Sequence, residues 1–510
     1  MTAMTPYPPL QAPALKVLSC LVRRVARAAP AWILGLAVAG CAVGPDYRRP
    51  EVETPAAFRH AEGWKAAEPA DTVGQGPWWR LYRDPVLDGL QSRLDAANQT
   101  LAQAQAQYRL SQALARGARA AFFPVLGASA GKTRSGRGGA GGGAVRLPDG
   151  STVATGGGGG VDNSYDLSFA ISWEMDLWGR LRRQLEAETA GLQASAADLA
   201  AARLSLQSEL ALNYLQLRVL DEQKRLLDAT VAAYQRSLRL TGNQYEAGIV
   251  PKSDVTQALA QLRGAQAQAI DLVHQRAQLE HAIAVLVGVP PAAFRLAEEQ
   301  GVPELPGIPA LLPSELLERR PDVASAERQV MAANAAIGVA QSAWFPSLEL
   351  SAAGGWRSGG FANWISAPNR FWSIGPQFAM ALFDGGLIRS RVEQAEASYD
   401  RTVGFYRQTV LDSFREVEDF LVQLRVLEEE AGVQREALEA ARESLRLLEN
   451  QYQAGTIDYN DVVNVQTAAL NSERASLALL GSRLAASVRL IAALGGGWDG
   501  ASLERLSARD

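Results

Sequence analysis

The chain has 510 residues, of which 47% are hydrophobic and 20% charged, and its formal net charge is −4. Proteins that bind nucleic acid usually carry a clustered basic excess, so this balance argues against nucleic acid as a partner. Two cysteines and three histidines are too few for a Cys-rich zinc site or for His-based catalysis. We therefore expect a protein that is not an enzyme and that binds no metal and no cofactor.

The first 40 residues have the features of a bacterial lipoprotein signal peptide. Three arginines precede the apolar stretch 28–39, which is far shorter than the ~20 residues of a membrane-spanning helix. Small residues then lead directly into Cys41, which predicts that residues 1–40 are removed and that Cys41 carries a lipid such as palmitate. An ordinary signal peptide with a chance cysteine is the alternative. Because Ala42 and not an aspartate follows, we expect a lipid-anchored protein in the outer membrane of a Gram-negative bacterium, with a large periplasmic part.

Two halves of the chain share one plan. The sequence Asn-Gln-Tyr-Glu-Ala-Gly at 243–248 recurs with one change at 450–455, and Ala-Phe-Phe-Pro at 121–124 recurs as Ala-Trp-Phe-Pro at 343–346. Each half reads as helix, strand, loop, strand, very long helix, tight turn and helix. The expected divisions are a linker at 41–84, repeat 1 at 85–300 (strand pair about 125–176, helix turn about 243–253), repeat 2 at 301–498 (strand pair about 347–383, helix turn about 450–460) and a C-terminal tail at 499–510.

Each half contains one strand with a strongly alternating pattern. In 165–176 and again in 371–382, bulky apolar residues occupy nearly every second position, with small or polar residues between them. Each run has about the 9–11 residues that a tilted transmembrane strand needs. The expected lipid-facing residues are Leu167, Phe169, Ile171, Trp173, Trp372, Ile374, Phe378 and Met380. For any one strand, a soluble sandwich with one buried face is the alternative.

Weaker partner strands are expected near 125–130 and 347–355, and the connecting loops are expected at the glycine-rich 131–160 and at 354–369. The stretch 127–133 resembles a phosphate-binding loop, but its spacing is one residue short and no helix follows, so we interpret it as loop. Four strands in one chain cannot close a membrane barrel. Closure therefore requires several chains, and three chains would supply twelve strands.

The helices are expected to be unusually long. No proline interrupts 178–242, and leucines recur every seven residues there, which indicates coiled-coil packing. A helix of that length reaches roughly 100 Å, which is the dimension of a tunnel and not of a globular core. Gly248 and Gly455 are placed to end the two long helices, and Pro251 and Asp458 are placed to begin the returning ones.

Five short motifs resemble those of one known family, the TolC-like outer-membrane factors, and in particular the NodT-type outer-membrane lipoproteins of tripartite efflux systems. The motifs are Cys41–Tyr47, Trp78–Leu87, Asp176–Arg180, Arg319–Val323 and Leu382–Gly386. The resemblance implies an α+β membrane protein that forms a homotrimer. Its twelve-stranded transmembrane β-barrel, with four strands per chain, would continue into a long periplasmic coiled-coil barrel of helices. It also implies partners: a periplasmic adaptor, an inner-membrane pump of the RND type, and outer-membrane lipid.

The resemblance further implies that the turns of the long helices form the periplasmic gate and the adaptor-docking site. The implied gate residues are Tyr452, Asp254, Asp458, Asp461 and Asn464, and the implied docking turns contain Gly248 and Gly455. Tyr452 is expected to bond to Asp254 and thereby to latch the closed gate. Asn464 stands where well-known members carry an inward-facing acid, so a cation-binding constriction is not expected. Helix capping is the alternative role for these residues.

No other group of residues supports a chemical site. His274 and His281 lie seven residues apart on one expected helix, where a coiled-coil surface is the favoured interpretation over metal binding. Glu174 and Asp176 share one face of a strand, which fits a polar lumen better than a glycosidase pair. Two functions remain: a passive efflux duct for small molecules such as drugs or toxic compounds, and a periplasmic coiled-coil scaffold lipoprotein without a channel. The alternating strands favour the duct.

Overall fold

The computed structural model describes residues 42–55, 58–59, 77–136, 144–146, 151–154, 161–307 and 319–498. The expected signal peptide, Cys41 and the tail at 499–510 lie outside these residues. The chain divides into two compact units, each built from both halves of the sequence. Unit 1 comprises Met1–Tyr47, Leu114–Glu188 and Ala332–Tyr399, and unit 2 comprises Arg48–Ala113, Thr189–Met331 and Asp400–Asp510.

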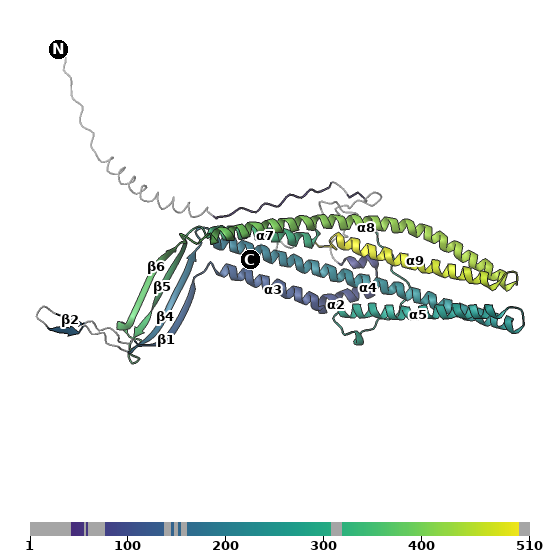
Figure 1. Cartoon of the computed structure of the whole chain (residues 1–510), viewed down its shortest axis with the longest axis horizontal. Helices are drawn as coiled ribbons and strands as arrows, with labels where there is room; N and C mark the ends of the chain where they lie inside the picture. The colour runs from purple at the N-terminus through teal and green to yellow at the C-terminus, as the bar shows by residue number, and fades with distance from the viewer. Residues whose placement is uncertain are drawn as a thin grey trace, which may run out of the picture. The chain divides into compact units, whose positions relative to one another are not determined.

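Unit 1 contains one antiparallel four-stranded sheet (Figure 1). Its strands, in spatial order, are β1 (Val125–Gly136), β4 (Val161–Met175), β5 (Ser347–Ser358) and β6 (Arg370–Ala379). The two expected strand pairs are therefore not separate, because β4 of the first half pairs with β5 of the second half. Strands β1 and β6 form the two edges of the sheet.

The strand limits correct three expectations. The stretch 127–133, which we expected to be loop, lies inside β1, where every residue is paired with β4. The expected loops 131–160 and 354–369 are shorter, because β1 runs to Gly136 and β5 to Ser358, and a small hairpin of β2 (Ala144–Arg146) and β3 (Thr152–Ala154) lies within the first. Small residues are compatible with a strand when the neighbouring strand satisfies their backbone groups, which composition alone does not reveal.

The register divides the sheet into an apolar and a polar face, because residues directly opposite each other in an antiparallel pair point to the same side. The apolar face contains Leu126, Leu167, Phe169, Ile171, Trp173, Leu350, Trp356, Trp372, Ile374 and Phe378. The polar face contains Ser129, Ser168, Ser172, Glu174, Glu349, Ser351, Ser373 and Gln377. Seven of the eight residues expected to face lipid share the apolar face, whereas Met380 lies one residue beyond the end of β6.

The helices repeat in length between the two halves. The two long helices α4 (Arg180–Glu246) and α8 (Leu387–Gln453) have 67 residues each, and the returning helices α5 (Lys252–Leu286) and α9 (Tyr459–Ala493) have 35 each. A 67-residue helix is about 100 Å long. The shorter helices are α2 (Pro85–Ala97), α3 (Gln99–Ala120) and α7 (Pro321–Ser342), with 3-10 turns η1 (Trp78–Tyr82), η2 (Pro291–Ala293) and η3 (Ala367–Asn369).

Unit 2 has a helical core that includes two buried polar anchors. The Tyr82 hydroxyl lies 2.6 Å from the Ser487 hydroxyl, and burial raises the pKa of Tyr82 well above its usual range. The Arg320 guanidinium donates to Asp322, Glu416 and the carbonyl of Ala493. Among the described helices, α9 alone is long and apolar enough to cross a membrane, but Leu484, Val488 and Ile491 are buried within the protein, as in a core helix.

Candidate functional site

Two helical hairpins end in the same backbone turn. At the end of α4, the amide of Ile249 donates to the carbonyl of Gln244 and the amide of Gly248 to that of Tyr245. Thr456 and Gly455 make the same two bonds at the end of α8. Gly248 and Gly455 have φ of +73° and +74°, which is the left-handed conformation that a Schellman cap requires. The expected role of both glycines as helix terminators is thus confirmed.

A small buried cluster joins the two hairpins close to these turns. Its core consists of Ala258 on α5 with Tyr452, Tyr459, Val462 and Val463 on α8 and α9. The rings of Tyr452 and Tyr459 lie 5.6 Å apart. Leu238 of α4 and Ile457 of the second turn pack against the cluster. The second hairpin therefore supplies both aromatic side chains, and the first hairpin supplies part of the surface that receives them.

Hydrogen bonds fix the two tyrosines. The Tyr452 hydroxyl donates to Oε1 of Gln244 at 2.8 Å, and the Tyr459 hydroxyl accepts from Ser237 at 3.2 Å. A phenol has one proton to donate, so the expected bond from Tyr452 to Asp254 is wrong in this structure. The Asp254 carboxylate instead accepts from the Ser253 hydroxyl at 3.1 Å. Burial raises the pKa of Tyr459, with smaller contributions from Tyr452 and from the charge of Asp254.

Three of the expected gate residues form a separate stripe. Asp458, Asp461 and Asn464 are spaced three apart at the start of α9 and are all exposed, on the opposite side from the buried Val462 and Val463. Asp458 occupies the N-cap position, but its side chain makes no capping bond. The capping alternative therefore does not account for the carboxylate of Asp458.

Polar side chains connect α5 to α9 along the length of the hairpins. Gln257 donates to Asn460 at 2.8 Å, and Arg474 donates to Gln268 at 2.8 Å. These contacts and Gln244 were missed in the sequence. The only available signal for Gln244 was the repeated Asn-Gln-Tyr triplet at 243–245 and 450–452, which does not indicate which of its side chains contacts the other hairpin.

In unit 1 the described N-terminal residues 42–47 form a strap against helices α4 and α7. The amide of Val43 donates to the carbonyl of Trp178 at 2.9 Å, and the amide of Asn334 donates to the carbonyl of Pro45 at 2.9 Å. The Arg183 side chain, only 7% exposed, donates to the carbonyls of Val43 and Gly44 and to the carboxylate of Asp46. The strap is therefore held by backbone and charged contacts together.

The strap crosses α7 at a point where the strap and the helix each have a glycine. A Cβ on Gly338 would lie 2.8 Å from the Val43 carbonyl and from Cγ of Arg183. Gly44, with φ of +107°, could carry no Cβ either, because it would lie 2.4 Å from Cα of Gly338. The motif Cys41–Tyr47 pointed to this segment in the sequence, but nothing in the sequence indicated Arg183 or Gly338 as its receptor.

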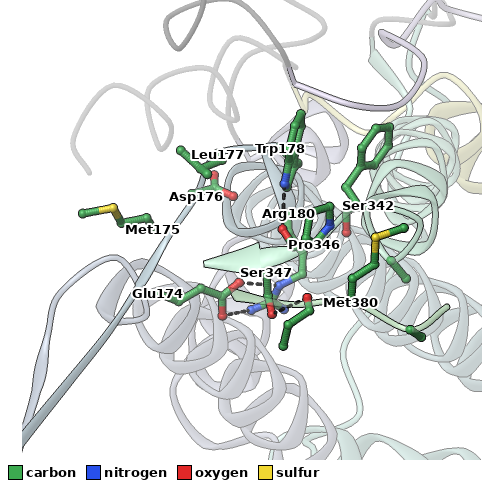
Figure 2. Close-up of a pocket in the computed structure, with 14 residues that line it drawn as sticks. Glu174, Met175, Asp176, Leu177, Trp178, Arg180, Ser342, Pro346, Ser347 and Met380 are labelled. Carbon is green, nitrogen blue, oxygen red and sulfur yellow. Dashed lines mark hydrogen bonds and ion pairs between the residues drawn. The ribbon is translucent and has the colours of Figure 1, made fainter. Parts of the chain in front are cut away.

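A cavity of about 350 Å³ lies where the strands of unit 1 meet its helices (Figure 2). Glu174 forms a two-point ion pair with Arg180, and Asp176 accepts from the amides of Leu181 and Arg182 at the start of α4. The indole of Trp178 donates to the Pro346 carbonyl at 2.8 Å. Glu174 and Asp176 thus have structural roles, and no group of three or more metal-binding side chains occurs among the described residues.

Comparison with known proteins places these features in a family context. The family model described as outer membrane efflux protein matches residues 90–289 and 312–496. The matched residues include all four long helices, the four strands of the sheet and both hairpin turns.

Curated relatives and solved structures match over nearly the whole length. The chain is 32% identical over 438 residues to the pyoverdine export outer membrane protein OpmQ of Pseudomonas aeruginosa, covering 85% of this chain and 90% of OpmQ. It is 29% identical over 484 residues to the toluene efflux pump outer membrane protein TtgF of Pseudomonas putida, covering 94% and 98%. The solved outer-membrane channel OprN superposes with a TM-score of 0.80 at 30% identity, covering 90% of this chain and 100% of that one. The open state of the MtrE outer membrane channel of Neisseria gonorrhoeae superposes with a TM-score of 0.77 at 25% identity, covering 90% and 99%.

Proposed function

The chain belongs to the outer membrane efflux protein family, and from this premise we propose that its two hairpin ends form the closed periplasmic gate of an efflux duct. Family membership confirms the predicted function as an outer-membrane efflux channel and the prediction that the chain is a passive transporter and not an enzyme. It likewise confirms the predicted architecture of a trimeric channel with four strands and long helices per chain. The scaffold without a channel is thereby set aside.

The contact between the hairpins is the observation that carries the gate proposal. The two hairpin ends are held together by the small apolar cluster and by a few side-chain hydrogen bonds. These bonds join Tyr452 to Gln244, Tyr459 to Ser237 and Gln257 to Asn460. Elements held by few buried contacts open most easily, because little free energy is lost when they separate. Opening would move the second hairpin away from the first, which is a shift between two preset arrangements. In a trimer, the acidic stripe of Asp458 and Asp461 would surround the constriction on its inner side.

Efflux pump outer membrane proteins work with an adaptor and an inner-membrane pump. We assign the turns around Gly248 and Gly455 to adaptor docking, because they are the exposed ends of the hairpins and share one backbone geometry. The pump is proposed to be of the RND type.

Small organic molecules are the proposed cargo class, since relatives are named for toluene, antibiotic and pyoverdine export. The repeat divisions 85–300 and 301–498 are proposed as the units that carry one hairpin each.

A lipid on Cys41 is proposed as the anchor of the chain. The strap supports this proposal, because residue 42 is held beside Gly179, next to the strands, so that an acyl chain on the preceding residue would start at a fixed place. Metabolic labelling with palmitate should be lost in Cys41→Ser and retained in Cys41-containing strap variants such as Arg183→Ala. Undiminished labelling of Cys41→Ser would contradict the anchor.

The gate is tested by single-channel recording in planar lipid bilayers. Tyr452→Phe removes the hydroxyl that reaches Gln244, so we expect more frequent opening and a higher mean conductance than in the wild type. Tyr245→Phe is the matched control, since Tyr245 occupies the same position in the first repeat but is 44% exposed. Gln244→Ala should reproduce the effect of Tyr452→Phe. Wild-type conductance in the double variant Tyr452→Phe, Gln244→Ala would contradict the role of this contact in gating.

A further inference from the structure

The end of the sheet that lies away from the helices carries a concentration of positive charge on its apolar face. Strands β4, β5 and β6 each adjoin a helix at one end, so the β1–β4 and β5–β6 connections lie at the other end. Near these connections, the register places Lys132 and Arg134 of β1 and Arg370 of β6 on the same side as Phe169 and Ile374. All three cationic side chains are exposed. In an outer-membrane channel with periplasmic helices, this end of the sheet is the extracellular one.

No acid accompanies these cations on the strands of that face. Lys132 is opposite Tyr165, Arg134 is opposite Asn163, and Arg370 is opposite Trp356. The acids at the same level, Asp162 and Asp166, point to the polar face. None of the three cations forms an ion pair with any residue that the structure describes, whereas Arg357 on the polar face pairs with Asp166. Among the described residues, the three cations on the apolar face therefore have no anionic partner.

Aromatic side chains lie directly beside the cations. The Lys132 ammonium is 5.3 Å from the centre of the Tyr165 ring, and Tyr165 contacts Phe361 and Trp364 of the connecting segment. Trp372 follows one pleat further into the sheet. Aromatic rings mark the membrane interface in transmembrane barrels, so the cations stand at the level of the lipid headgroups and not within the hydrocarbon.

Closing a twelve-stranded barrel from three chains joins the β6 edge of one chain to the β1 edge of the next. This places Arg370 of one protomer on the same outer surface as Lys132 and Arg134 of its neighbour, at each of three seams. Guanidinium and ammonium groups bind phosphate through charge-assisted hydrogen bonds. We propose that each seam binds the phosphorylated glycolipid of the outer leaflet through Lys132, Arg134 and Arg370. The proposal uses the trimeric barrel and is independent of the gate.

The experiment measures binding of lipid A to purified trimers by native mass spectrometry. The probe is hexa-acylated lipid A with two phosphates, compared with the same lipid after removal of both phosphates and with phosphatidylglycerol. We expect binding to the wild type that weakens at least about tenfold in Lys132→Gln, Arg134→Gln, Arg370→Gln, since each cation near a charged lipid surface contributes on the order of a factor of five. Arg357→Gln, which removes a cation from the polar face, should bind as the wild type does.

Two further measurements keep the test decisive. If the triple variant assembles poorly, the single variant Arg370→Gln should still show weaker binding than the wild type with intact trimers. Lipid A without phosphates should bind weakly to all variants, and channel conductance should not change. The proposal would be overturned if the triple variant and Arg370→Gln bound lipid A as well as the wild type does. Equal binding of lipid A with and without phosphates would also overturn it. Stronger binding of phosphatidylglycerol than of lipid A would likewise overturn it, because the site would then not select the glycolipid.

Discussion

Large apolar and aromatic side chains are exposed on the sheet but buried at the hairpin ends. On the sheet, Trp372 and Ile374 are 80% and 66% exposed, whereas Tyr452 and Tyr459 at the hairpin ends are 8% and 2% exposed. The sheet thus presents an apolar surface that needs an apolar environment from outside the chain. The hairpin ends find their apolar partners within the chain, and few of them. We therefore expect the stability of the first region to depend on lipid, and that of the second on a few contacts within the chain.

The sharpest test of this comparison is a charge on the apolar face of the sheet. Phe169→Lys should destabilise the barrel by about 2–4 kcal/mol if the site is near the bilayer midplane. Urea unfolding of the protein in lipid vesicles measures the change. The control is Ala170→Lys, which places the same charge at the next residue on the polar face, opposite Gly127 and Ala353. Equal losses in the two variants would contradict the assignment of the faces.

Release of the strap should have the next largest effect. Arg183→Ala removes bonds from a buried guanidinium to two carbonyls and a carboxylate, and hydrogen bonds to charged groups contribute about 1.5–3 kcal/mol. Hydrogen–deuterium exchange of residues 42–47 should become faster, because the Val43 amide is then less well protected. Arg182→Ala is the control, since the Arg182 side chain bonds to Asp176 and to no described residue of the strap. Unchanged exchange in Arg183→Ala would show that the strap is held by other contacts.

Two glycines of α8 and its turn should respond in opposite directions to the same change. Gly455→Ala forces a side chain into φ of +74° and should destabilise the second hairpin by about 1 kcal/mol. Gly432 lies within α8, where an added Cβ would meet no other atom within 4 Å. Gly432→Ala should therefore stabilise the helix by about 0.5–1 kcal/mol. Thermal unfolding followed by circular dichroism at 222 nm compares them. A loss of stability in both would mean that the turn conformation is not the reason for the first.

The smallest expected effect is a pH dependence of the hairpin contact. Because burial raises the pKa of Tyr459 in the folded state, its contribution is fully present below about pH 10, the unfolded value, and is lost as the pH rises through the folded value. Hydrogen exchange of the start of α9, measured between pH 9 and 11 and corrected for intrinsic rates, should accelerate at the alkaline end. Tyr459→Phe should abolish this acceleration, and its persistence there would assign it to another group.

Much of the fold was predictable because it depends on periodic patterns. The alternation of Phe169, Ile171 and Trp173 with small residues required a two-sided strand, and the proline-free heptads required long helices. Gly248 and Gly455 were predictable as helix ends because few residues other than glycine adopt positive φ. The sequence did not reveal that β4 pairs with β5, because such a pairing depends on how two distant halves of the chain meet.

The candidate site was less predictable because its contacts depend on rotamers and distances. Tyr452 was predicted to be a gate residue with Asp254 as its partner, yet its hydroxyl donates to Gln244. Both candidate partners are polar residues near a helix turn, and composition does not rank them. Arg183 was missed for a related reason, since an arginine in a charged helix start has no distinguishing pattern until the strap is seen to cross it.

The pairing of β4 with β5 has a consequence for the rate at which the protein folds. Asp166 and Arg357 are joined across these strands although they lie 191 residues apart in the sequence. The intervening chain contains the whole of the first helical hairpin, so this closure has a high contact order and is expected to be slow. During that interval the early β1–β4 pair exposes a free strand edge that can associate with other chains. Chaperone protection in the periplasm is therefore expected to matter most for the β1–β4 strand pair, before β5 of the second half pairs with β4.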